Sequence, residues 1–263
     1  MKRLFALLTA LLLLTGCSQL ETPPEDEDIL FPLEEQADTT EATALPEVFS
    51  LPYLSTQPLN PLACPDGMQQ TVASLLYEGL FHLDTALAPQ PVLCASYTYD
   101  AEALTYTLTL RPNAVFSDGS PLTAADVKTT LTAAKASPRY SERLTDLKSV
   151  SGSGSTVTLT LNRANSALPA LLDIPIPSKS SAGNAVPIGT GPYVYTTGDN
   201  GASLMKNTAW WKGESLPVDT IPLRTVDSEN TLTYLFSSHA IQMLLTDYTG
   251  SDPVSYKGNL SIT

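Results

Sequence analysis

The sequence predicts an α/β protein, because helix-like and strand-like patterns alternate along most of its 263 residues. Met68, Val72 and Leu76 recur at the spacing that places apolar side chains on one face of a helix. The segments TYTLTLR (105–111) and STVTLTLN (155–162) alternate apolar and hydroxyl residues, which is typical of strands with one buried face. Helices packed on half-buried sheets follow from this combination.

Other segments extend the same architecture. EVFSLPYLS (47–55) reads as a first strand, and residues 166–172 as a short helix. The second half predicts a β-β-β-α-β order: a hairpin at 191–207 that turns at Gly198–Gly201, a strand at 220–226, a helix at 228–238 with Ser228 as N-cap, and a strand at 240–247.

The stretch FSDGSPLTAADV (116–127) resembles either a catalytic cluster or the junction between a strand and a helix. Asp118 and the following glycine are typical of a turn. Thr123 and Asp126 have the spacing of a capping box, in which each side chain bonds backbone at the start of a helix that runs to about residue 135. No base is placed to activate Ser120, so the interpretation is structural and no catalytic residue is predicted.

The N-terminus predicts export. Lys2 and Arg3 precede an apolar run from Leu4 to Leu14, which is too short to span a bilayer and has the proportions of a signal peptide. The run ends in Leu-Thr-Gly-Cys and resembles the lipobox of bacterial lipoproteins, which implies lipidation of Cys17. The alternative is an ordinary secretory signal with a chance cysteine. Residues 1–17 are therefore predicted to be a lipoprotein signal, with the rest anchored on the outer side of the cytoplasmic membrane.

Residues 18–45 are rich in acidic residues, threonine and proline, and predict a disordered tether. Up to residue 110 the chain has two basic and fifteen acidic residues, whereas the remainder has twelve of each. The net charge of −13 therefore belongs to the first part. With no basic patch interleaved with aromatics, nucleic-acid binding is not expected.

Two cysteines remain after Cys17. An even pair in an exported protein favours a disulfide between Cys64 and Cys94, which would stabilise the fold by roughly 3–4 kcal/mol; two buried thiols are the alternative. The two histidines lie far apart and no C-x-x-C occurs, so neither a metal site nor a cofactor is predicted.

Five strings in order resemble the bacterial extracellular solute-binding proteins that serve peptide, nickel and related ABC transporters. They are LLYEGLFHLD (75–84), APQPVLCASY (88–97), TYTLTLRPNAVFSDGSPLTAADV (105–127), IGTGPYVY (188–195) and LMKNTAWW (204–211). The resemblance runs from about Val48 to Asp247. It implies a type II periplasmic-binding-protein-like α/β fold with two lobes, which closes on its ligand by hinge motion.

By this resemblance, residues 46–62 and 187–246 form the sheet domain of lobe one, and residues 63–186 form an inserted α+β subdomain. Residues 247–263 would begin the hinge and second lobe. Because family members are substantially longer, we expect the second lobe and the segment that returns from it to be missing from this chain, and ligand binding by these 263 residues to be weak.

The resemblance places ligand contacts at Thr56, Gln57 and Pro58, after the first strand, and less directly at Gly189 and Tyr193. A plain loop and a tight turn are the alternatives for these two places. Trp210 and Trp211 are interpreted as packing residues.

The implied function is capture of peptides or another small solute for the permease subunits of an ABC importer, without chemistry. A truncated remnant that acts as a surface scaffold lipoprotein is the alternative. An enzyme has little support, because no nucleophile–base pair, metal cluster or phosphate loop occurs.

Overall fold

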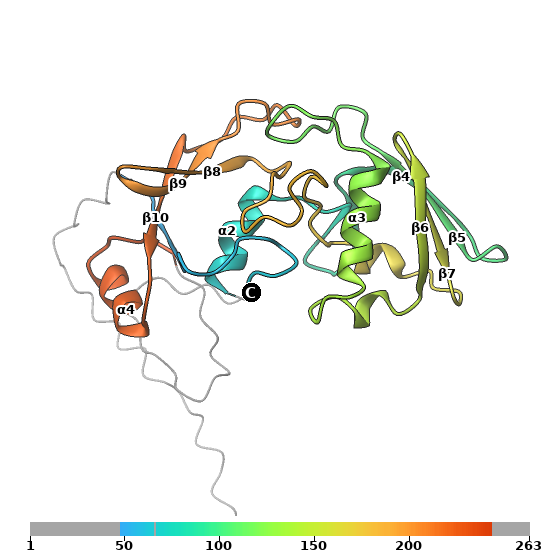
Figure 1. The fold of residues 1–263 in the computed structure, drawn as a ribbon, viewed down its shortest axis with the longest axis horizontal. Coiled ribbons are helices and arrows are strands. Elements are labelled where there is room, and N and C mark those ends of the chain that lie inside the picture. Colours follow the sequence, from blue (N-terminus) through green and yellow to red (C-terminus); the bar gives the residue numbers. More distant parts are fainter. Residues whose placement is uncertain (1–47, 66, 244–263) are drawn as a thin grey trace, which may run out of the picture. The chain divides into compact units, whose positions relative to one another are not determined.

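The computed structural model describes residues 48–65 and 67–243. The described residues form one compact unit (Figure 1). The lipobox and the tether therefore lie outside the described residues. Within the described ranges, no helix is both long and apolar enough to cross a bilayer.

One sheet is mixed, with the strand order β1-β10-β9-β8. Strand β1 (Leu51–Tyr53) runs parallel to β10 (Thr220–Thr225), although some 170 residues separate them in the sequence. Strands β8 (Tyr193–Gly198) and β9 (Gly201–Lys206) form the predicted hairpin, and β9 pairs antiparallel with β10. The hairpin turns through Gly201, whose φ of 95° favours glycine.

Helix α2 (Met68–Leu76) packs against this mixed sheet. Its Val72, Ala73 and Leu76 share a core with apolar residues of all four strands. A Cβ on Gly189 would lie 2.0 Å from the carbonyl oxygen of Leu76, so only glycine permits this approach. The IGTGPY string is therefore a packing motif at the end of α2.

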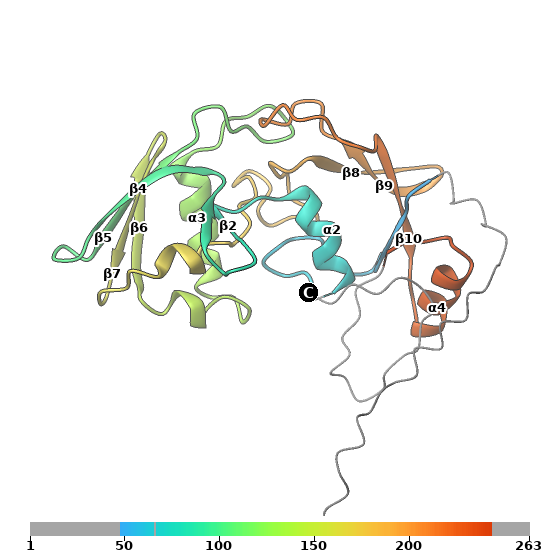
Figure 2. The ribbon, with the colours of Figure 1, turned by 180° about the vertical axis from the view of Figure 1, so that it is seen from behind.

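The second large sheet is antiparallel, with the order β4-β5-β7-β6 (Figures 1 and 2). Its strands span Cys94–Asp100, Thr105–Leu110, Thr156–Leu161 and Leu147–Ser153, in that order. Alternate residues of β5 and β7 are buried, as the sequence predicts, while their threonines lie on the other face. Helix α3 (Ala124–Ala134) contacts β6 and β7.

The predicted capping box at the start of α3 is confirmed. The carboxylate of Asp126 accepts hydrogen bonds from the Thr123 backbone N–H at 3.0 Å and from the Thr123 hydroxyl at 2.5 Å. Its other oxygen accepts from the backbone N–H of Lys179 at 2.9 Å, so the cap also ties α3 to a distant segment. Asp118 accepts from the backbone and hydroxyl of Ser120 within a turn. Asp118, Ser120, Thr123 and Asp126 are therefore structural.

Shorter elements complete the described chain. They are β2 (Phe81–Leu83), which pairs with β3 (Pro89–Pro91), the 3-10 turns η1 (Glu142–Leu144) and η2 (Leu168–Leu171), and α4 (Glu229–Ser237). Ser228 caps α4 as predicted, because its hydroxyl accepts from the Thr231 N–H.

Two expectations need correction. The predicted Cys64–Cys94 disulfide is not formed: the two buried cysteines lie in different core clusters, and the Cys94 thiol donates to the Ser96 carbonyl oxygen. The strand predicted at 240–247 is absent from its described part, residues 240–243, and its remainder lies outside the described residues. The apolar string there was too short to distinguish a strand from a loop that covers a core.

The core clusters also bear on the predicted domains. Helix α2 belongs to the core of the mixed sheet, whereas the core of the antiparallel sheet runs from Leu80 to Ile176. We therefore propose that the inserted subdomain begins after α2, later in the chain than the predicted boundary at residues 62/63.

Candidate functional site

The carboxyl ends of the parallel strands β1 and β10 form the edge where ligands bind in open α/β sheets. We name the loops that leave these strands, Leu54–Pro58 and Val226–Ser228, the carboxyl edge. The two loops are joined at their start, because the N–H of Val226 donates to the carbonyl oxygen of Tyr53 at 2.9 Å. The side chains of Ser55, Thr56 and Gln57 are exposed there.

A small apolar cluster packs against the loops of the carboxyl edge. Val226, Leu232 of α4 and Ile241 form its buried centre, against which Leu54 and Met68 pack. The cluster joins the first loop, helix α4 and the start of α2. The exposed polar residues Ser55, Thr56 and Gln57 therefore follow a residue, Leu54, that is packed against this cluster.

The second loop of the carboxyl edge supplies its one charged side chain among the described residues. Asp227 is exposed and accepts a hydrogen bond from the Thr231 hydroxyl, which holds the pKa of the Asp227 carboxyl below its usual value. Asp227 is therefore ionised at neutral pH. With the hydroxyls of Ser55, Thr56 and Ser228, it gives the edge a polar and mildly acidic character.

The structure does not bring all the predicted ligand residues together. Thr56, Gln57 and Pro58 lie on the carboxyl edge. Gly189 packs against the C-terminal end of α2, whereas the carboxyl edge lies at the N-terminal end of this helix. A helix of nine residues is roughly 13 Å long, so Gly189 lies well away from the edge. Tyr193 is buried in the core of the mixed sheet, where its hydroxyl donates to the Val218 carbonyl oxygen at 2.8 Å.

Sequence reasoning missed Gln69, whose buried side chain bonds the first loop of the carboxyl edge. Its position beside the apolar stripe of α2 was the only signal, and a polar residue there is ordinarily read as solvent-exposed.

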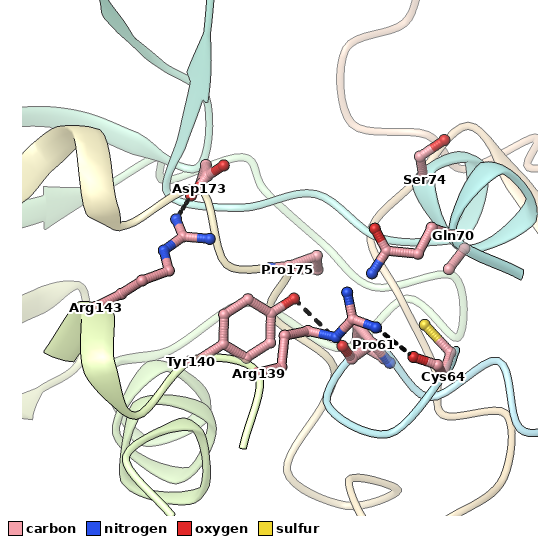
Figure 3. Close-up of a pocket in the computed structure, with 10 residues that line it drawn as sticks. Pro61, Cys64, Gln70, Ser74, Arg139, Tyr140, Arg143, Asp173 and Pro175 are labelled. Carbon is pink, nitrogen blue, oxygen red and sulfur yellow. Dashed lines mark hydrogen bonds and ion pairs between the residues drawn. The ribbon is translucent and has the colours of Figure 1, made fainter. Parts of the chain in front are cut away.

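A pocket of about 210 Å³ lies between α2 and the inserted subdomain (Figure 3). Its charged groups are already engaged: the Arg143 guanidinium forms an ion pair with Asp173, and Arg139 donates to the Cys64 carbonyl oxygen at 2.7 Å. Tyr140 lies between the two arginines, with its hydroxyl directed to the Pro61 carbonyl oxygen. The volume is below that of ordinary ligand pockets.

An adjoining pocket of about 510 Å³ shares Ser74, Asp173 and Pro175 with the first. Its Glu78 carboxylate pairs with Lys212 at 3.0 Å and accepts from the Trp211 indole N–H at 2.6 Å. These contacts hold neighbouring segments together. Among residues 48–65 and 67–243, no group of three His, Cys, Asp or Glu side chains is arranged to hold a metal ion.

The chain matches the bacterial extracellular solute-binding proteins, family 5 middle, over residues 88–260, which is more than half of its length. It belongs to this solute-binding family. Residues 1–18 match the prokaryotic membrane lipoprotein lipid attachment site, so this family member is a lipid-anchored extracytoplasmic protein. That match includes Cys17, the predicted acylated residue.

Curated relatives of this solute-binding protein include glutathione-binding proteins. The protein GsiB of Salmonella typhimurium is 31% identical over 188 residues, which cover 66% of this chain and 37% of the relative. GsiB of Pectobacterium atrosepticum is 31% identical over 199 residues, covering 70% and 39% respectively. The chain thus spans about two fifths of the length of these relatives. They are solute-binding proteins, which supports in general terms the interpretation that this chain is not an enzyme.

Solved structures show the fold. NikZ of Campylobacter jejuni, in complex with Ni(L-His), matches with a TM-score of 0.58 at 22% identity, over 74% of this chain and 41% of NikZ. AppA of Bacillus subtilis, in complex with a nonapeptide, matches with a TM-score of 0.58 at 24% identity, over 73% and 42%. The chain therefore has the type II periplasmic-binding-protein fold, of which it covers lobe one with its extra subdomain. No second lobe is present among the described residues.

Proposed function

We propose that this lipoprotein captures small peptides outside the membrane and delivers them to the permease of an ABC importer. The observation that carries the proposal is the carboxyl edge, where a polar loop stands exposed at the end of parallel strands in a solute-binding fold. The relatives named for glutathione and the neighbour bound to a nonapeptide favour a peptide as the solute.

The edge has the chemistry for a peptide. Ser55 and Thr56 supply hydroxyls that donate and accept, and the ionised Asp227 suits an ammonium group. Within the described structure, the backbone N–H and C=O groups of Ser55 and Thr56 form no hydrogen bond with another protein group. A peptide backbone offers the same alternation of donors and acceptors.

An NMR titration of the uniformly ¹⁵N-labelled chain with reduced glutathione and with trialanine tests the proposal, because it detects even millimolar binding. We expect saturable shifts at the amides of Ser55, Thr56 and Gln57. Sucrose serves as the control solute. Shifts confined to the pocket around His82 and Lys212, or none with either peptide, would overturn the proposal.

A matched pair of variants then locates the site. Gln57→Ala removes an exposed side chain from the carboxyl edge and should weaken glutathione binding several-fold. Thr107→Ala removes an exposed side chain from the antiparallel sheet and should change nothing. Equal affinities in the two variants would place the ligand elsewhere.

A further inference from the structure

The side chain of Gln69 is completely buried, at 0% exposure, beneath the first loop of the carboxyl edge. Its Oε1 accepts from the backbone N–H of Leu54 at 2.8 Å. Its Nε2 donates to the carbonyl oxygens of Leu54 at 3.2 Å, Gln57 at 3.1 Å and Pro58 at 3.3 Å. One side chain thus bonds backbone at both ends of a five-residue loop.

An amide fits this position, whereas an ionised carboxylate or an apolar side chain does not. The site presents one N–H and three carbonyl oxygens. The glutamine amide has a carbonyl oxygen that accepts from the N–H and an NH₂ group, with two N–H donors, that faces the three oxygens. A carboxylate would face three carbonyl oxygens, and an apolar side chain would leave the Leu54 N–H without a partner. A buried unsatisfied polar group is costly, so the residue type is closely specified.

Gln69 itself is held rigidly. It lies in the first turn of α2, whose Val72, Ala73 and Leu76 are buried in the core of the mixed sheet. At the other end of the helix, the Leu76 carbonyl oxygen accepts from the Gly191 N–H at 3.0 Å. The Gln69 amide therefore holds the loop at a fixed position relative to a packed helix.

The bonds divide the loop into two parts. The carbonyl oxygens of Leu54, Gln57 and Pro58 are taken by Gln69, and the Gln57 N–H donates to the Leu54 carbonyl oxygen at 3.1 Å. Ser55 and Thr56, between these anchors, keep their backbone groups for solvent or ligand. The loop tip is thus set in advance of binding.

We propose that Gln69 is the positioning residue of the carboxyl edge, which fixes the loop for a ligand that it does not itself touch. The inference rests on the proposed function for what the loop binds. A ligand then meets a pre-set surface at Ser55 and Thr56, and the cost of ordering the loop is avoided at the moment of binding.

Hydrogen exchange and glutathione titration of the full chain test this role with Gln69→Met, which keeps the volume and removes the amide. Exchange of the Leu54 amide should accelerate by at least about tenfold, because its hydrogen bond is lost. Glutathione affinity should fall by about the same factor, while amides of the antiparallel sheet keep their protection. The control is Asn165→Leu, which removes a half-buried amide that bonds the Asp146 carboxylate and the Ala167 N–H in the inserted subdomain, and it should leave Leu54 exchange and glutathione affinity unchanged.

Gln69→Glu makes the same contact titratable. Burial and the facing carbonyl oxygens raise the pKa of the introduced carboxyl. Its protonated form can accept from Leu54 and donate to one carbonyl, whereas its ionised form is repelled. Leu54 protection should therefore be present at acidic pH and be lost as pH rises through the raised pKa.

Unchanged Leu54 exchange in Gln69→Met, or no pH dependence in Gln69→Glu, overturns the inference. If Gln69→Met fails to fold, the comparison of Gln69→Glu at low and high pH decides it. If no peptide shifts the wild-type spectrum, the proposed function fails, and the exchange measurement still decides whether Gln69 holds the loop.

Discussion

The two four-stranded sheets differ in how far apart their strands lie in the sequence. The antiparallel sheet is built from residues 94–161 and covered by α3, which lies between two of its strands in the sequence. The mixed sheet joins β1 to β10 across most of the described chain and relies on α2 and on glycines at 189 and 191. The first sheet is assembled from neighbours, and the second, which carries the candidate site, is assembled from distant segments.

The largest effect should come from Gly189→Ala, because the new Cβ would lie 2.0 Å from the Leu76 carbonyl oxygen. We expect a loss of about 3 kcal/mol in the free energy of unfolding, measured by urea denaturation. Hydrogen exchange should show the mixed sheet losing protection before the antiparallel one. Gly183→Ala, where a Cβ would meet nothing within 4 Å, is the control and should be nearly neutral. Equal loss of protection in both sheets would mean that they unfold as one unit.

Asp126→Ala should destabilise α3 and the antiparallel sheet. It removes the acceptor for the Thr123 and Lys179 N–H groups, so we expect a loss of about 2 kcal/mol, with α3 and its sheet losing protection first. Asp118→Ala, in an exposed turn of the same stretch, should cost much less. A larger effect of Asp118→Ala would contradict the structural ranking of these two carboxylates.

A third test concerns the cysteines, one in each core. Reductant should leave the free energy of unfolding unchanged, whereas loss of a bridge would lower it by roughly 3–4 kcal/mol. In the Cys17→Ser background, denatured protein without reductant should show two titratable thiols. Burial raises the pKa of the Cys94 thiol to about 11, so this thiol should react slowly in the native state at pH 8. If neither thiol can be titrated, the two cysteines form a disulfide after all.

The smallest effect concerns Asp118. Hydrogen bonds from the Ser120 hydroxyl and N–H hold the pKa of the Asp118 carboxyl below its usual value. This group therefore contributes stability above its unfolded pKa, and the contribution is lost as pH falls through the folded pKa. Ser120→Ala should raise the pKa toward the ordinary range, as measured by carboxyl ¹³C NMR. Ser153→Ala is the control, and an unchanged pKa in Ser120→Ala would exclude the hydroxyl as the cause.

Local patterns predicted the local parts of this fold. The alternation in β5 and β7, the β8–β9 hairpin and the Thr123–Asp126 cap all depend on contacts within a few residues or on one buried face. Strand β6 was missed, because Lys148, Ser149 and Ser151 interrupt any apolar alternation.

The candidate site was predicted less completely, since it depends on distant pairings. The sequence singled out the loop at Thr56–Pro58 only through its resemblance to a family. Gln69 contacts carbonyl oxygens 11 to 15 residues away, and that relation has no local signature. Gly189 was predicted as a ligand contact, with a tight turn as the alternative, and the Leu76 carbonyl oxygen that requires glycine there became apparent only in the structure.

Trp211 gives the molecule a built-in optical probe. The two tryptophans of the chain are adjacent, and Trp211 packs on the core of the inserted subdomain although it follows β9 of the mixed sheet. Its indole N–H bonds Glu78, and Arg111 lies over its ring. The Trp211 contribution to the intrinsic fluorescence therefore monitors the contact between the two cores, without a dye or an engineered label.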